Sequence, residues 1–154
     1  MTVLEQIRQR LQAVGIEVYS LLFHRPVFTS EEAAAVRGTP LASGAKALLL
    51  KADDRFILAV LPADRKLDNR QLRERLGVKS LRFAQRDELW QLTGLTPGAI
   101  PPFGSLFNLP TYCDPVLLEQ PEINFNIGDH AVSMHMRTED YLRLENPIQL
   151  PLAC

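Results

Sequence analysis

The chain has 154 residues, and its contents of 46% hydrophobic and 23% charged residues are close to the averages of globular proteins. We expect one domain over residues 1–154, because a chain of this length buries roughly 70% of its unfolded surface and can form its own core. The net charge of −1 excludes a polycation, no apolar run reaches the ~18 residues of a membrane span, and the first residues lack a signal-peptide pattern. These features predict a cytoplasmic protein without a membrane partner.

Two helix signals flank a strand signal at the start of the chain. A Thr–x–x–Glu capping box at Thr2 begins a helix with apolar residues at helical spacing, and Gly15 predicts its end. Residues 16–23 carry β-branched and aromatic side chains and predict a strand. A second capping box at Thr29 begins an alanine-rich helix that stops at Gly38.

A β-hairpin is the strongest signal in the next part of the chain. Two apolar runs, residues 45–52 and 56–61, are joined by a short polar turn, which predicts two largely buried antiparallel strands. Asp68 then caps a short helix, residues 78–83 predict a short strand, and residues 87–93 predict another short helix.

Residues 94–110 contain four prolines and three glycines, a composition that fits neither a helix nor a central strand. This segment exceeds the typical connection of ~4–6 residues, and long loops of this kind are often functional, although a purely structural loop is the alternative. The rest of the chain predicts three strands, a short helix and an irregular tail, at residues 111–113, 123–127, 132–136, 138–144 and 145–154. This order favours an α/β (α+β) fold with a curved mixed sheet flanked by helices.

Few residues have the pattern of a catalytic or metal site. Lys46 interrupts an apolar run, so its side chain either reaches solvent at the sheet edge or points into a polar pocket. His130 and His135 with Asp129 could be drawn as a metal site, but positions five apart on a strand face opposite sides, so we expect no metal. Cys113 lies in an apolar strand, where a cysteine behaves as a small hydrophobic residue.

Basic residues are concentrated between Arg65 and Arg86, with eight of them against two acidic residues. Such a segment is either a solvated helix face or a local phosphate-binding patch. Composition alone favours the solvated face.

One loop resembles a known family. Residues 94–104 are similar to the G-x-x-P-G-x-x-x-P-F-G loop of the YbaK / prolyl-tRNA synthetase insertion (editing) domain family. The lysine-bearing strand at residues 43–50 lies in the family's order before this loop. Other segments match in the same order, at residues 29–34, 60–68, 111–114 and 126–130. The resemblance covers about residues 3–144.

The resemblance implies the fold, a curved mixed sheet or partial barrel, and the activity, a freestanding trans-editing aminoacyl-tRNA deacylase. Such enzymes hydrolyse the ester of mischarged tRNA, here with tRNA-Pro carrying a small wrong amino acid as the leading expectation. No cofactor is implied. The ester is already reactive, so a ribose hydroxyl or an oriented water can attack it in a site that supplies position and charge. A catalytically idle tRNA- or synthetase-binding module and a hydrolase of small free esters remain the alternatives.

The resemblance also implies the site residues. Lys46 is expected to be the catalytic cation that holds the terminal phosphate or the ester region. The residues expected to bind substrate are Gly94, Pro97, Gly98, Ala99, Ile100, Pro102, Phe103, Gly104, Gly128, Asp129 and His130. For Asp129 and His130 the alternative is that they only shape a turn. Those expected on the tRNA backbone are Arg70, Arg73 and Arg75.

The aminoacylated acceptor end of tRNA is the expected partner. A net charge near zero predicts only modest affinity for tRNA. Prolyl-tRNA synthetase or an elongation factor is therefore a candidate second partner that helps to bind the tRNA. Family members that clear alanine often carry Asn after the lysine and His-Pro near the late turn, where this chain has Ala47 and residues 128–130 read Gly-Asp-His. The amino acid that is cleared is therefore left open.

Overall fold

The computed structural model describes all 154 residues and contains five α-helices. Thr2 caps the first helix with a complete capping box, and three glycines with positive φ, Gly38, Gly77 and Gly94, end the next three, because only a residue without Cβ adopts this conformation freely. The helices are α1 Val3–Ala13, α2 Ser30–Arg37, α3 Asn69–Leu76, α4 Arg86–Thr93 and α5 Thr138–Glu145. Three short 3₁₀ turns lie between them, η1 Leu41–Ser43, η2 Gly104–Phe107 and η3 Leu117–Glu119.

The larger sheet has five strands in the order β4-β2-β3-β5-β8. The predicted hairpin forms its centre, with β2 and β3 antiparallel and Leu49 opposite Leu58. β5 and β8 add to it in parallel, so the sheet is mixed. The bounds are β2 Ala45–Ala52, β3 Arg55–Pro62, β4 Leu81–Phe83, β5 Thr111–Cys113 and β8 Ile148–Gln149.

The smaller sheet is antiparallel, with the order β1-β7-β6. Its strands are β1 Tyr19–Phe23, β6 Glu122–Asn126 and β7 Val132–Arg137. A single bridge between Gly44 and Asn124 links it to the larger sheet. The predicted α+β class, with a mixed sheet flanked by helices, is confirmed. The strands divide into two sheets, and a partial barrel is not confirmed.

The edge of β2 explains why the two sheets do not merge. β3 pairs with one edge of β2 along its whole length. The other edge meets β6 only at Gly44, and β4 from Leu50 onward. Residues 45–48 therefore have no strand beside them on this edge, and the two sheets separate there.

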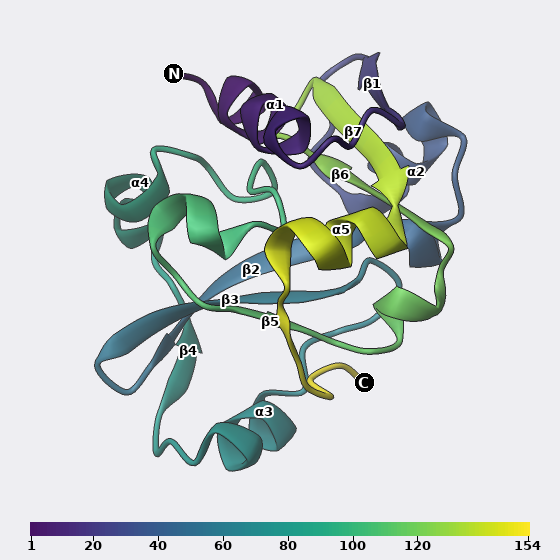
Figure 1. Ribbon diagram of the computed structural model, residues 1–154. Coiled ribbons are helices and arrows are strands. Elements are labelled where there is room, and N and C mark those ends of the chain that lie inside the picture. The colour runs from purple at the N-terminus through teal and green to yellow at the C-terminus, as the bar shows by residue number, and fades with distance from the viewer.

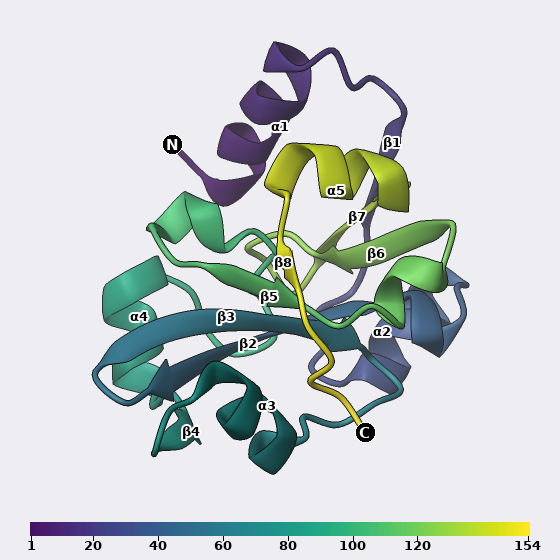
Figure 2. The ribbon, with the colours of Figure 1, turned by 60° about the horizontal axis from the view of Figure 1, so that its bottom comes forward.

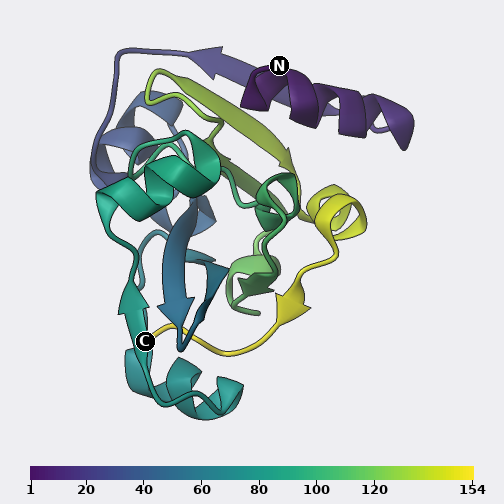
Figure 3. The same ribbon diagram turned by 90° about the vertical axis from the view of Figure 1, so that its left-hand side faces the viewer.

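Two groups of buried side chains hold the layers together. The larger one contains Phe103, whose ring packs edge to face on Phe125 and Tyr141 with centroids 5.6 Å and 5.2 Å apart. The smaller one lies between the five-stranded sheet and α3, around Leu72. Figure 2 shows this sheet with α3 on one side and α5 and α1 on the other, and Figures 1 and 3 place α1 and α3 at opposite ends of the molecule. None of the helices is both long and apolar enough to cross a lipid bilayer.

The C-terminal tail, predicted to be irregular over residues 145–154, contains a strand and is tied to the fold. β8 pairs with β5, and the side chain of Leu152 is fully buried. The buried carboxylate of Asp114 accepts hydrogen bonds from the backbone N–H groups of Leu152 and Ala153, both at 2.9 Å. A buried carboxylate needs such donors. The short strand β8 is compatible with Pro147, because it begins only after this proline and has two residues.

Candidate active site

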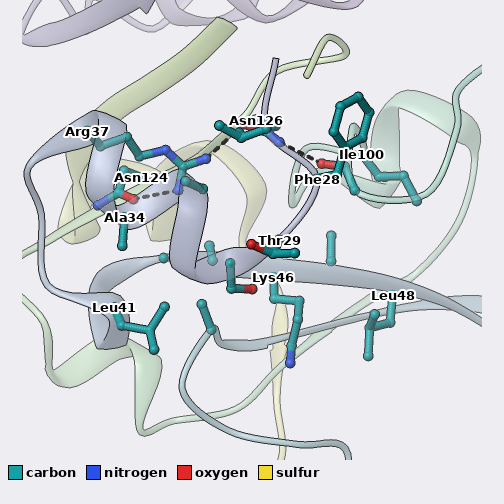
Figure 4. A pocket seen from close by; sticks show the side chains of 18 of the residues that line it. Phe28, Thr29, Ala34, Arg37, Leu41, Lys46, Leu48, Ile100, Asn124 and Asn126 are labelled. Atoms are coloured by element: carbon teal, nitrogen blue, oxygen red, sulfur yellow. Dashed lines mark hydrogen bonds between the residues drawn. The ribbon is translucent and has the colours of Figure 1, made fainter. Parts of the chain in front are cut away.

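A pocket of about 200 Å³ opens beside the unpaired edge of β2. Its walls come from the segment before α2, from α2 itself, from η1 and the start of β2, and from the loop before Pro101 and β6 (Figure 4). Both apolar side chains and convergent polar groups line it, as is typical of ligand sites. The 19 lining residues are Val27, Phe28, Thr29, Ser30, Ala33, Ala34, Arg37, Pro40, Leu41, Gly44, Ala45, Lys46, Ala47, Leu48, Ala63, Gly98, Ile100, Asn124 and Asn126.

Lys46 lines this pocket, so the alternative of a pocket-directed lysine gains structural support. Its Nζ donates to the backbone O of Arg65 at 2.7 Å, and two of its three N–H groups are left for other acceptors. Burial lowers the pKa of Lys46, while the carboxylates of Glu31 and Asp64 act in the opposite direction. Figure 4 shows the ammonium pointing away from Arg37, so the two cations of the pocket lie apart.

Arg37 forms a polar wall that the sequence did not predict. Its Nε donates to Ser133 Oγ at 2.8 Å, Nη1 to Asn124 Oδ1 at 2.9 Å and Nη2 to Asn126 Oδ1 at 2.9 Å. All three acceptors are neutral, and burial lowers the pKa of Arg37 to about 10. The available signal was the pair Asn124 and Asn126, which face the same side of a strand because they are two residues apart.

The proline- and glycine-rich loop reaches the pocket only with Gly98 and Ile100. The backbone O of Gly98 accepts a hydrogen bond from Asn126 Nδ2 at 2.8 Å, which ties the loop to β6. Gly98 has φ +88°, and a Cβ on it would lie 3.3 Å from Cε1 of His130. Backbone conformation and close contact therefore both favour glycine here.

Other predicted residues of this loop shape it from the core side. Ala99 O accepts from Gly128 N at 2.8 Å, and Pro102 O accepts from the buried Tyr141 hydroxyl at 2.7 Å. Phe103 is fully buried. A Cβ on Gly104 would lie 2.6 Å from Thr111 Oγ1, so no side chain fits.

His130 joins the loop to the segment before α2. Its Nδ1 lies 3.1 Å from the backbone O of Val27, its Nε2 lies 2.9 Å from Thr96 Oγ1, and its ring packs on Phe28 with centroids 4.7 Å apart. Because Nδ1 faces a carbonyl oxygen, it carries a proton and donates. His130 is not among the lining residues, but it contacts Val27 and Phe28, which are.

The remaining predicted substrate-binding residues lie outside the pocket. Gly94, Gly128 and Asp129 line a different hollow beside the start of α1, and Pro97 lines neither. A Cβ on Gly128 would lie 2.9 Å from Cβ of Val3, so this glycine permits the approach of α1.

The three arginines expected on the tRNA backbone belong to α3, and none lines the pocket. Arg70 pairs with Glu74 at 3.2 Å, and Arg75 donates to Gln71 Oε1 at 3.3 Å. Arg73 is partly exposed. Arg70 and Arg75 are exposed to solvent.

The pocket contains no candidate nucleophile of the cysteine–histidine type. None of its lining residues is a cysteine, histidine, aspartate or glutamate. Cys113 is fully buried elsewhere, and burial together with the nearby Asp114 raises the pKa of its thiol to about 12. His24 contacts Ser133, and His135 pairs with Glu122. No group of three or more His, Cys, Asp or Glu side chains is placed to hold a metal ion.

Solved structures define the class of this fold. The chain superposes with a TM-score of 0.86 on a structure presented as a candidate trans-editing enzyme for prolyl tRNA synthetase, at 24% identity and covering 100% of this chain and 98% of that one. A protein described only as hypothetical gives the same TM-score at 23% identity, covering 96% and 99%. At these identities the likeness establishes the fold alone, that of an α+β domain.

Sequence comparison gives the family. The model of the aminoacyl-tRNA editing domain matches residues 24–144. The chain is 37% identical over 134 residues to the multifunctional Ser/Thr-tRNA deacylase ProXp-y of Escherichia coli K12, covering 84% of this chain and 80% of that protein. It is 34% identical over 90 residues to the prolyl-tRNA editing protein ProX of Acetoanaerobium sticklandii, covering 57% and 55%. The chain therefore belongs to the aminoacyl-tRNA editing domain family, which confirms the predicted family and the enzyme class, an aminoacyl-tRNA deacylase.

Proposed function

We propose that the pocket beside β2 binds the aminoacyl-adenosine end of a mischarged tRNA and promotes hydrolysis of its ester bond. The observation that carries the proposal is the cation Lys46 in a pocket whose lining has no acidic residue. Such a lining favours a ligand with negative charge or developing oxyanion charge. A volume of about 200 Å³ lies below the roughly 300–1,000 Å³ of pockets for drug-sized ligands, which suits a small amino acid.

In this proposal Lys46 contacts the charged part of the substrate. Its ammonium retains two N–H groups for a phosphate or for the ester region. Gly98 and Ile100 enclose the aminoacyl group, and the Gly98 carbonyl retains a lone pair for the α-ammonium. With no acid–base side chain in the lining, the attacking group is the vicinal ribose hydroxyl or a water that it orients.

The substrate tRNA also needs a binding surface outside the pocket. We place its phosphates along the exposed face of α3, with Arg70, Arg73 and Arg75, because phosphate neutralisation dominates nucleic-acid affinity. Prolyl-tRNA synthetase or an elongation factor would then deliver the mischarged tRNA, and the reaction would take place in the cytoplasm, where tRNA is charged.

Two amino-acid classes are candidates for removal. The resemblance to prolyl-tRNA editing domains favours tRNA-Pro with a small wrong amino acid. The relative ProXp-y, a Ser/Thr-tRNA deacylase at 37% identity, favours seryl and threonyl esters. The polar wall around Arg37 supports the second class, because a hydroxyl group needs polar partners when it is buried.

The test is release of labelled amino acid from alanyl-, seryl-, threonyl- and cysteinyl-tRNA, including tRNA-Pro charged with each, with correctly charged prolyl-tRNA as the control. We expect release above the spontaneous rate from at least one mischarged tRNA and none from prolyl-tRNA. Absence of release throughout, together with tRNA binding, would establish the idle binding module. Equal turnover of free aminoacyl esters would establish a hydrolase of small esters.

A further inference from the structure

Arg37 is a partly buried cation without an acidic partner. Its three acceptors, Ser133, Asn124 and Asn126, are all uncharged. A desolvated charge is normally balanced by a counter-ion or retained for a ligand. No ion pair accounts for its position, which leaves a ligand group as the counterpart of this wall.

The wall offers both a donor and an acceptor. A guanidinium has five N–H groups, and three of them are used, which leaves two. The carbonyl oxygen of Asn124 accepts only from Arg37 and keeps one lone pair, while its amide donates to Ser43 Oγ at 2.9 Å. A hydroxyl group is the ligand that uses both, because it accepts one hydrogen bond and donates another.

The position of the wall separates this group from the phosphate of the substrate. Lys46 points away from Arg37 (Figure 4), toward Arg65 and the basic segment that follows. The rest of the lining includes apolar residues, among them Ala34, Ala45 and Ile100. A ligand that spans the pocket with its phosphate near Lys46 therefore places its amino-acid side chain near Arg37.

We infer that Arg37, oriented by Asn124, Asn126 and Ser133, is the residue that selects aminoacyl groups with a side-chain hydroxyl. This inference rests on the proposed deacylase function. It assigns the substrate class to seryl and threonyl esters, because alanine has no hydroxyl and a thiol is a weak hydrogen-bonding group. A site built to hydrogen-bond a substrate hydroxyl discriminates strongly against an analogue that lacks it.

The variant for the test must preserve the wall. Arg37 and Asn124 also line a second cavity of about 330 Å³ beside β1 and β7, so truncation to Ala would connect the two spaces. Arg37→Met keeps most of the side-chain volume and removes the donors. Arg8→Met, on the exposed surface of α1, is the matched control.

The measurement is kcat/KM for seryl-, threonyl- and alanyl-tRNA with wild type, Arg37→Met and Arg8→Met. We expect wild type to prefer the hydroxyl-bearing esters. Arg37→Met should lower kcat/KM for them by about 10- to 100-fold, the range for one lost hydrogen bond to a charged group, with less than about threefold change for alanyl-tRNA. Arg8→Met should match wild type.

Each other outcome has a distinct meaning. An equal loss of kcat/KM on all three substrates would make Arg37 a structural residue and overturn the inference. A wild type with equal kcat/KM for the three substrates would also overturn it. In both cases the deacylase function would stand. A wild type that releases no amino acid would overturn the proposed function itself. If Arg37→Met does not fold by circular dichroism, Arg37→Lys takes its place, because it keeps the charge without the fork of donors. An unchanged seryl-to-alanyl ratio in that variant would overturn the inference.

Discussion

At the scale of single residues, the packing around Gly104 leaves no room for a side chain. Gly104 lies where β5 meets the loop, and its backbone N–H donates to Thr111 Oγ1 at 2.8 Å. An added Cβ would lie 2.6 Å from that oxygen and 2.8 Å from the backbone O of Leu109. Since backbone atoms cannot move aside cheaply, this glycine is required by packing and makes no contact with the pocket.

We therefore expect Gly104→Ala to lower the free energy of unfolding by about 2–3 kcal/mol, the upper part of the range for an overpacked core. Gly77→Ala is the matched control, because nothing lies within 4 Å of its added Cβ and only its φ of +68° opposes the change. We expect about 1 kcal/mol for the control, from backbone strain alone. Urea unfolding of the two variants measures both values, and equal losses would contradict the packing argument.

At the scale of elements, local signals predicted the helices and the hairpin well. The capping residues and terminal glycines act within one turn of the helix that they bound, so the sequence contains them directly. Arg37 was missed for the opposite reason. Its acceptors lie on β6 and β7, nearly a hundred residues later, and no local pattern indicates which strands will meet α2.

The C-terminal tail is a second element that depends on distant partners. Asp114 holds it through two backbone N–H groups, and its other carboxylate oxygen accepts from Val116 N at 2.8 Å. Asp114→Ala leaves these donors without their acceptor, so we expect a loss of about 3 kcal/mol in stability. We also expect faster cleavage of the last five residues in limited proteolysis. A tail that stays protected in this variant would show that β8 and Leu152 hold it without the carboxylate.

At the scale of the whole molecule, the two cysteines differ in their exposure to solvent, so their reactivity tests the fold. Cys154 is exposed, whereas Cys113 is buried in the larger core and its thiol pKa is raised to about 12. A thiol reagent should therefore modify one cysteine in the native protein and two in denaturant. Rapid modification of both under native conditions would contradict the burial of β5.

The same thiol gives the molecule a pH dependence. Its pKa is raised in the folded state above the ordinary value of 9.0, so the folded protein keeps a proton that the unfolded chain releases. The contribution of this protonated thiol to the folding stability is complete below pH 9 and is lost as the pH rises toward 12. Cys113→Ala should lose stability at all pH values through its cavity but should show a smaller decline above pH 9, as measured by urea unfolding. An unchanged alkaline slope would place the cause elsewhere.

We propose the pocket beside β2 as the hydrolytic site. The most direct measurement is the rate of amino-acid release from the preferred mischarged tRNA by wild type, Lys46→Ala and Lys51→Ala. Lys51 is the matched control because it lies on the same strand, outside the pocket, with its Nζ 5.7 Å from the ring centroid of Phe56. We predict a fall of about 100-fold or more for Lys46→Ala, as for the loss of one oxyanion-stabilising donor, and little change for Lys51→Ala. Full activity in Lys46→Ala, or an equal loss in both variants, would contradict the claim.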